Sequence, residues 1–359
     1  MLKILDRYIL KRYLGTFSVM LLLFIPIGIM VDLSSKIDNI IESNAPLNLV
    51  IYFYFNFTIY MGYLLFPLFL FLSVIWFTSK LANNTEIIAI LSSGVSFNRF
   101  LRPYLIGAAL VAVFFFLVGM FVMPNSSKEY NEFKYEYLHR YRKDKDEGVT
   151  FRQINDNEYI YVSSFNSKTK TGYNFTLEHF EGNELKHKIQ AIKIQYREKD
   201  SSYKLTNYVR RNIGEHHDEI IRKTRKDTIF EFDLDDLTPV KYIAETKSYT
   251  ELNDFIEKEK KRGSSFVSRY IVVKHKRWSI PVSAFILTII AVAVSAMKRR
   301  GGMGMNLALG IALAFIFIFI DKIFTVMADQ SGFNPLLAVW LPNITFGILA
   351  IYLLNNAKR

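Results

Sequence analysis

The sequence predicts an α-helical membrane protein with six transmembrane helices and an inserted, jelly-roll-like all-β domain outside the cytoplasm. The chain has 359 residues, of which 51% are hydrophobic, with 31 Phe and 21 Tyr. Six apolar stretches match the length of about 20 residues that a helix needs to cross a bilayer. Between the third and fourth stretches lies a polar region in which hydrophobic residues alternate at the period of a β-strand.

The apolar stretches fall into two groups of three. They cover residues 13–31, 52–77, 101–123, 278–297, 303–326 and 335–354. Prolines lie in or near several of them, which membrane helices tolerate better than soluble helices do. We therefore expect three parts: transmembrane helices one to three in 1–123, the β domain with flanking helices in 124–277, and transmembrane helices four to six in 278–359.

The basic residues predict the orientation in the membrane. Outside the β domain there are 14 Lys and Arg, and 12 of them lie on one side if the six spans alternate. Only Lys36 and Lys322 lie elsewhere. Because basic residues are retained on the cytoplasmic side, both termini and the loop between the second and third spans are expected in the cytoplasm. The β domain is then outside.

The insertion is expected to begin with a helix, because Tyr130, Phe133, Tyr137 and Tyr141 recur at helical spacing. Short alternating strands separated by polar turns follow, a pattern typical of an antiparallel sandwich or a jelly roll. Before the fourth span, residues 248–251 have the pattern of a capping box that starts another helix. The expected strands cover residues 149–154, 158–162, 173–180, 185–196, 203–209 and 228–232.

The loop between the second and third spans predicts a short helix at about residues 84–94. Asn84 or Thr85 can cap its start, and Glu86 lies in the first turn, where the helix dipole favours an anion. Gly94 is placed to end the helix. On these residues alone, a plain helical connector explains the loop as well as a functional helix does. The apolar face consists of Ile87, Ile88, Ile90 and Leu91.

Several kinds of chemistry are not expected. The chain has no cysteine, which excludes thiolate metal sites and thiol nucleophiles. It has no P-loop motif to hold a nucleoside triphosphate, no nucleophile elbow and no pair of histidines at metal-binding spacing. The net charge is +12, but the aromatic residues of the insertion recur at strand period, which favours core packing over nucleic-acid binding. We expect no enzyme, no metal site, no cofactor in this chain and no nucleic-acid partner.

Charged residues near the outer ends of the spans favour contact with lipid. Asp321 and Lys322 lie late in the fifth span, where a charge costs less than at the bilayer centre. Lys36 follows the first span and Arg277 precedes the fourth, so cations gather at one depth. Such a ring suits an anionic lipid headgroup, and it equally suits ordinary lipid contact. For Asp321 and Lys322, structural anchoring and a role in a path for an amphiphile are equally good explanations.

Four motifs, taken together with the order of the spans, resemble one family. The LptF/LptG (YjgP/YjgQ) permease family of the lipopolysaccharide export ABC transporter has the same order of three spans, an outer β domain and three spans. The motifs extend over nearly the whole chain. They are the loop helix 84–96 followed by Pro103, the helix 251–263, the segment His275-Lys-Arg277-Trp-Ser-Ile-Pro281, and the segment Pro335-Leu-Leu-Ala-Val-Trp-Leu-Pro-Asn343.

This resemblance implies a permease subunit that extracts lipopolysaccharide from the bacterial inner membrane and is not itself an enzyme. In the family, two such permeases pair on a cytoplasmic ABC ATPase dimer, and the ATPase binds ATP and Mg²⁺. The loop helix docks on the ATPase, which makes Glu86 the coupling carboxylate. The residues that would shape the docked helix are Ile87, Ile90, Leu91 and Gly94.

The resemblance also implies a path for the lipid. The first and fifth spans form a lateral gate in the family, which makes Lys36, Lys322 and Arg277 candidates for contacts to the substrate. The β domain lies in the periplasm and passes the lipid to a periplasmic bridge protein or a single-span accessory subunit. The alternative is a membrane-anchored sensor with a ligand-binding β domain, which would have a signalling partner and no co-purifying ATPase.

Overall fold

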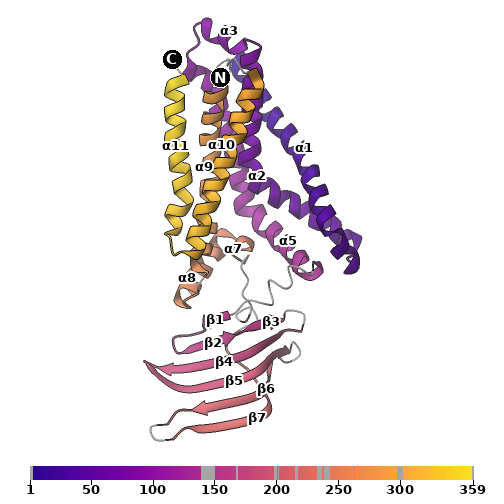
Figure 1. Ribbon diagram of the computed structural model, residues 1–359, viewed down its shortest axis with the longest axis vertical. Helices are drawn as coiled ribbons and strands as arrows, with labels where there is room; N and C mark the ends of the chain where they lie inside the picture. The colour runs from indigo at the N-terminus through magenta and orange to yellow at the C-terminus, as the bar shows by residue number, and fades with distance from the viewer. Residues whose placement is uncertain are drawn as a thin grey trace.

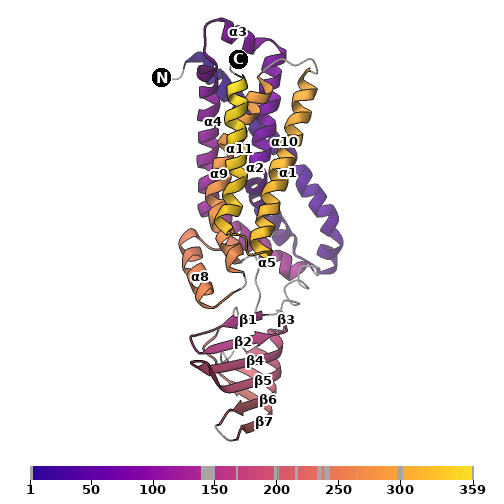
Figure 2. The ribbon, with the colours of Figure 1, turned by 60° about the vertical axis from the view of Figure 1, so that its left-hand side comes forward.

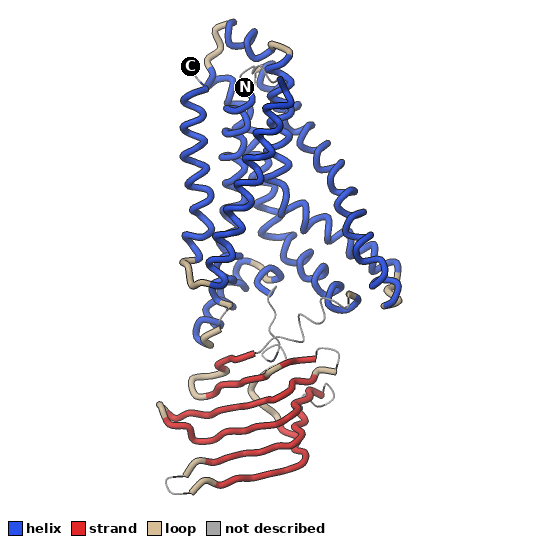
Figure 3. The backbone as a smooth tube through the Cα atoms, viewed as in Figure 1, coloured by secondary structure: helices blue, strands red, loops and turns tan. Residues whose placement is uncertain are grey.

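The protein is elongated, with a bundle of helices at one end and a β-sheet at the other (Figure 1). Both termini and the short helix α3 lie at the end of the bundle that faces away from the sheet (Figures 1 and 2). Helices and strands occupy separate regions in space (Figure 3). The structure, a computed structural model, describes residues 3–138, 150–166, 169–197, 200, 202–214, 217–232, 237, 243–264, 266–296 and 302–357.

Six helices among the described residues are long and apolar enough to cross a membrane, which confirms the predicted fold class. Most of them extend beyond the predicted spans. The third continues through a π-helical turn, η1 (Val118–Val122), into α5 (Met123–Tyr137). This continuation confirms the helix expected from the aromatic spacing, although Tyr141 lies outside the described residues. The six are α1 (Ile4–Glu42), α2 (Leu47–Asn83), α4 (Phe97–Leu117), α9 (Val267–Ser295), α10 (Gly302–Gln330) and α11 (Pro335–Ala357).

Near its N-terminus, α1 packs closely against both α4 and α9. A Cβ at Gly107 of α4 would lie 2.6 Å from the Tyr13 ring of α1, so the absence of a side chain lets the two helices approach. The Tyr13 hydroxyl lies 3.0 Å from Oγ1 of Thr288 on α9. Beyond Phe17 no residue of α1 is buried until Lys36. The middle of α1 accordingly leans away from the bundle (Figure 1).

The described strands form one antiparallel sheet in the order β1-β2-β4-β5-β6-β7, with β3 paired to β4. One face carries an apolar core that includes Ile160, Leu177 and Ile189. The antiparallel β domain is thus confirmed, and its described strands follow one another as a meander. The strands are β1 (Thr150–Gln153), β2 (Glu158–Val162), β3 (Ser164–Asn166), β4 (Thr171–Glu181), β5 (Glu184–Arg197), β6 (Ser202–Asn212) and β7 (Glu219–Thr228).

The strand expected at 228–232 is wrong. The chain leaves the sheet after Thr228, and Phe230 and Phe232 fold onto its apolar core. The Tyr203 hydroxyl donates a hydrogen bond of 3.0 Å to the carbonyl oxygen of Phe232, which holds this segment in place. The strand before it, β7, escaped prediction because an exposed edge strand with polar residues on both faces lacks the alternating pattern.

Two short helices connect the sheet to the fourth span. They are α7 (Ile243–Thr246) and α8 (Tyr249–Lys261). The predicted capping box at the start of α8 is confirmed, because Ser248 N donates to Glu251 Oε2 at 2.9 Å and Glu251 N donates to Ser248 Oγ at 3.4 Å. At its other end α8 meets the sheet, where Gln153 N of β1 donates to the Arg262 carbonyl oxygen at 3.2 Å.

Candidate functional site

The helix α3 (Glu86–Ser92) stands at the end of the bundle remote from the sheet. Thr85 occupies the N-cap position in a left-handed conformation with φ of 62°, and its side chain makes no capping bond. Gly94 follows the helix with φ of 87°, as expected for a C′ glycine. The helix is therefore held between two sharp reversals of the chain, which present it as a distinct projection.

The two faces of α3 have different environments. Ile87 is 1% exposed and belongs to the core of the bundle, and Ile90 and Leu91 pack against that core. Ile88 on the opposite side is 52% exposed. The apolar residues that the sequence assigns to docking thus mainly attach α3 to its own bundle. Ile88 and the half-buried Glu86 are accessible to a partner, as are the exposed Ala89 and Ser92. The apolar periodicity alone does not distinguish Ile88 from its more buried neighbours.

Glu86 connects α3 to the first helix. Its Oε2 accepts a hydrogen bond of 2.9 Å from the Tyr8 hydroxyl of α1, and its Oε1 accepts one of 3.3 Å from Asn84 Nδ2. Two residues earlier on α1, both carboxylate oxygens of Asp6 accept bonds from the Arg99 guanidinium of α4, at 2.6 and 2.7 Å. Bidentate pairs of this kind fix orientation as well as distance. The start of α1 is therefore tied both to α3 and to α4.

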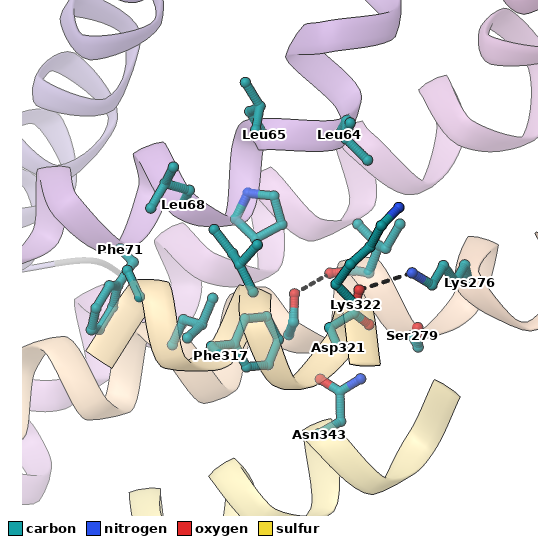
Figure 4. A pocket seen from close by; sticks show the side chains of 16 residues that line it. Leu64, Leu65, Leu68, Phe71, Lys276, Ser279, Phe317, Asp321, Lys322 and Asn343 are labelled. Carbon is teal, nitrogen blue, oxygen red and sulfur yellow. Dashed lines mark hydrogen bonds and ion pairs between the residues drawn. The ribbon is translucent and has the colours of Figure 1, made fainter. Parts of the chain in front are cut away.

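A cavity of about 430 Å³ lies among α2, α9, α10 and α11 (Figure 4). Most of its wall is apolar. The polar residues gather at the part of the wall formed by the beginning of α9 and the end of α10, which is the side of the bundle toward the sheet. The apolar side chains that line it are Leu64, Leu65, Pro67, Leu68, Phe71, Ile280, Leu287, Ala314, Phe317 and Ile318.

The polar part of the cavity contains an ion pair. Lys276 Nζ lies 2.8 Å from Asp321 Oδ2 (Figure 4). Lys322 lines the same cavity from the next position on α10. Asn343 of α11 also faces it, and its buried Oδ1 has no hydrogen-bond partner among the described residues. Because a buried polar atom without a partner is costly, this oxygen marks a place where a polar group of a ligand would be stabilised.

Arg277 lines a smaller cavity of about 100 Å³, which shares Lys276 with the first. Its Nη2 donates to the Lys247 carbonyl oxygen at 2.6 Å, and its Nη1 is buried without a hydrogen bond among the described residues. Glu245 of α7 lines this cavity too. Burial raises the pKa of the Glu245 carboxyl, and Arg269 and a hydrogen bond from the Tyr60 hydroxyl offset part of that rise.

Lys36 lies elsewhere, on α1 beside the beginning of α2. Its Nζ is 2.5 Å from Asp32 Oδ1 and faces the rings of Phe53, Phe57 and Tyr130 at 5.5 to 6.0 Å. A lysine held by a carboxylate and three aromatic rings suits the anchoring of α1 to α2 and α5. Lys322 and Arg277 thus line two cavities that share Lys276, and Lys36 lines neither of these cavities.

The chain matches the model of one known protein family. The model of the family described as lipopolysaccharide export system permease LptF/LptG matches residues 7–356. This range includes the described sheet and, apart from the first three residues of α1 and the last residue of α11, the six membrane helices. The chain belongs to the LptF/LptG family. No curated protein matches the chain.

Membership of the LptF/LptG family makes this chain a multi-pass membrane permease of lipopolysaccharide export. Members of this family are transporter subunits and do not themselves catalyse a reaction. We therefore consider two features of the bundle as candidates for a role in transport. They are the projecting helix α3 and the amphipathic cavity.

Proposed function

We propose that this chain is the permease subunit of an ATP-driven lipopolysaccharide exporter, and that it moves lipid from the inner membrane toward a periplasmic bridge. The observation that carries the proposal is the placement of α3 and the sheet at opposite ends of the bundle, with an amphipathic cavity between them. With α3 in the cytoplasm, as the basic residues predict, the sheet lies in the periplasm.

The coupling step is assigned to α3. The chain lacks a P-loop, so ATP and Mg²⁺ belong to a separate ABC ATPase dimer on which α3 docks. Glu86 is then the coupling carboxylate, and the exposed Ile88 supplies apolar contact beside it. Because the Tyr8 hydroxyl binds Glu86, a displacement of α3 reaches the start of α1 directly.

The lipid path is assigned to the cavity and to the two least buried membrane helices, α1 and α10. Its apolar wall suits acyl chains, and its Lys276 and Lys322 suit phosphate groups at the periplasmic end. A volume of about 430 Å³ is small for a whole lipopolysaccharide, so the complete path needs a second LptF/LptG-type permease. α1 and α10 bury the smallest shares of their apolar stretches, 6% and 22%, and form the lateral gate and the surface for that second subunit.

We assign to the sheet the transfer of lipid from the permease to the periplasmic bridge. The apolar core on one face of the sheet would receive acyl chains, and in this structure Phe230 and Phe232 cover part of it. On its outer side, β7 has no partner among the described strands. An edge strand can accept a further strand from another protein through backbone hydrogen bonds. A periplasmic bridge protein or a single-span accessory subunit would extend the sheet there.

The coupling role is tested by reversing the charge at Glu86. The Glu86→Lys chain, reconstituted with its partner permease and ATPase, is expected to lose at least about 10-fold in ATP-driven lipopolysaccharide release, since breaking a charge contact at an interface costs about 2–5 kcal/mol. Glu86→Gln, which still accepts a bond from Tyr8, should retain more activity than Glu86→Lys. Glu42→Lys is the matched control, because Glu42 ends α1 at the end remote from Tyr8 and Glu86. Unchanged release by the Glu86→Lys complex, or the absence of any co-purifying ATPase, would contradict the proposal.

A further inference from the structure

Three side chains with metal-binding atoms lie in a row across the sheet. Glu158 of β2 is the register partner of His179 of β4, and His179 is the register partner of His187 of β5. Residues two positions away on the same strands, Ile160 and Leu177, belong to the apolar core. Since side chains two apart on a strand share a face, the row lies on the core face of the sheet, at its margin.

The ligand atoms of this row are close enough for one ion. One oxygen or ring nitrogen from each of Glu158, His179 and His187 lies within 4.8 Å of the others. His179 Nδ1 and Glu158 Oε1 are 3.4 Å apart. Two ligands of a tetrahedral zinc ion, each about 2.0–2.1 Å from the metal, are about 3.3 Å apart. The rings of His179 and His187 stack with centroids 4.7 Å apart, so the third ligand lies beside the first two.

We propose that Glu158, His179 and His187 form a binding site for a divalent transition-metal ion of the zinc class. Two imidazoles and one carboxylate are the ligand set that suits zinc, whereas calcium and magnesium prefer oxygen ligands alone. Three protein ligands leave a fourth position for water or for a group of a bound ligand.

The surroundings of the row support the ligands. Asn155 Nδ2 donates to Glu158 Oε2 at 3.1 Å, which leaves Oε1 directed toward His179.

The site adjoins an open pocket of about 450 Å³ at the margin of the apolar core. Glu158 and His179 line this pocket together with Phe230, which packs on the core, and with the acidic side chains of Asp156 and Glu231. A bound cation would link β2, β4 and β5 at this margin. The spacing of the three ligands along the sequence did not indicate this site, because they come from three different strands.

The test uses the full chain in detergent micelles, with any affinity tag removed and metal stripped by a chelator. Co²⁺, whose visible absorption bands report tetrahedral ligation by nitrogen and oxygen, is titrated first, and Zn²⁺ is then used to displace it. We expect one equivalent to bind. His179→Ala and His187→Ala should each weaken binding at least about 100-fold, because loss of even an outer partner of a metal ligand costs 10–100-fold.

Matched controls separate this row from other histidines and acids. His275→Ala on α9 and Glu178→Gln, a neighbour of His179 that pairs with Lys188, should leave binding unchanged. Glu158→Gln keeps the shape of the side chain, so it reports on ligation even if an alanine variant fails to fold. Absence of stoichiometric Co²⁺ binding, or binding that Glu158→Gln and the histidine variants leave intact, would overturn the proposal.

Discussion

The helices α9 and α1 are both long and apolar, yet they occupy opposite extremes of the bundle. In the most apolar stretch of α9, 67% of the residues are buried, whereas in that of α1 only 6% are. Figures 1 and 2 show α9 surrounded by other helices and α1 at the margin. Hydropathy is similar in the two stretches, so hydropathy alone does not separate a central helix from a marginal one.

The difference lies in the size of side chains and in what they contact. The buried turns of α9 carry Ala284, Ala291 and Ala293 among larger residues, which lets α2, α4 and α11 pack closely against it. The middle of α1 carries large apolar residues that are mostly exposed, although Phe24 stacks on Phe69 of α2 with ring centroids 4.9 Å apart. These exposed residues are Val19, Leu22, Leu23, Phe24, Ile27, Met30 and Val31. Under the proposed function, α9 belongs to the stable frame of the permease and α1 is its lipid-facing or partner-facing moving part.

The largest expected effect comes from truncating matched isoleucines in the two helices. Ile290 of α9 is fully buried, and Ile27 of α1 is 56% exposed. Ile290→Ala should lower the free energy of unfolding by about 2 kcal/mol, because it leaves a cavity among packed helices. Ile27→Ala should change it by about 0.5 kcal/mol or less. Equilibrium unfolding in mixed micelles measures both values, and equal losses would remove the distinction between frame and moving part.

A smaller effect is expected at the cavity beside α10. Lys322→Gln removes one cation from its polar part and should weaken binding of lipopolysaccharide by about 10-fold, since a hydrogen bond to a charged group contributes about 1.5–3 kcal/mol. Lys36→Gln changes a lysine already held by Asp32 and should alter lipid binding less than it alters stability. Binding of fluorescent lipopolysaccharide to the purified chain measures the difference. A larger loss of lipopolysaccharide binding in Lys36→Gln than in Lys322→Gln would place the lipid contact at α1.

The smallest expected effect concerns Glu245 of α7, a short helix beside α9. This carboxyl makes the stability of the protein depend on pH. Since burial raises the pKa of Glu245, the folded chain binds more protons than the unfolded chain between the ordinary carboxyl pKa and the raised one. Stability from this group therefore falls as pH rises through that window and is regained as pH falls. Glu245→Gln should flatten the change in melting temperature between pH 5 and pH 8. A steeper slope in the variant would contradict this account of the buried carboxyl.

Features determined by neighbouring residues were predictable from the sequence. Gly94 ends α3 with a positive φ, and Ser248 and Glu251 form their capping box, because both depend on residues within one turn of a helix. The number of membrane helices followed from apolar length alone. The position of Lys322 late in the fifth span also placed it correctly at the sheet-facing part of the bundle.

Features that depend on distant segments were not predictable in the same way. The Tyr8–Glu86 bond joins residues 78 positions apart, and the Lys276–Asp321 pair joins residues 45 apart. Ile87 and Ile88 are chemically identical, and only the packing of α3 on the bundle buries one and exposes the other. Arg277 was expected at a membrane boundary, but its helix begins ten residues earlier, at Val267, and packing against α7 buries it.

The central claim, that lipid passes along the cavity between α2, α9 and α10, is tested most directly by site-specific photo-cross-linking in intact cells. A photoreactive amino acid would replace Ile318, which lines the cavity and is 39% exposed, and in a matched chain Ile290, which is fully buried. We expect a lipopolysaccharide adduct at position 318 that increases when ATP hydrolysis is active, and none at position 290. An adduct pattern that is the same at both positions, or no adduct at position 318, would contradict the account.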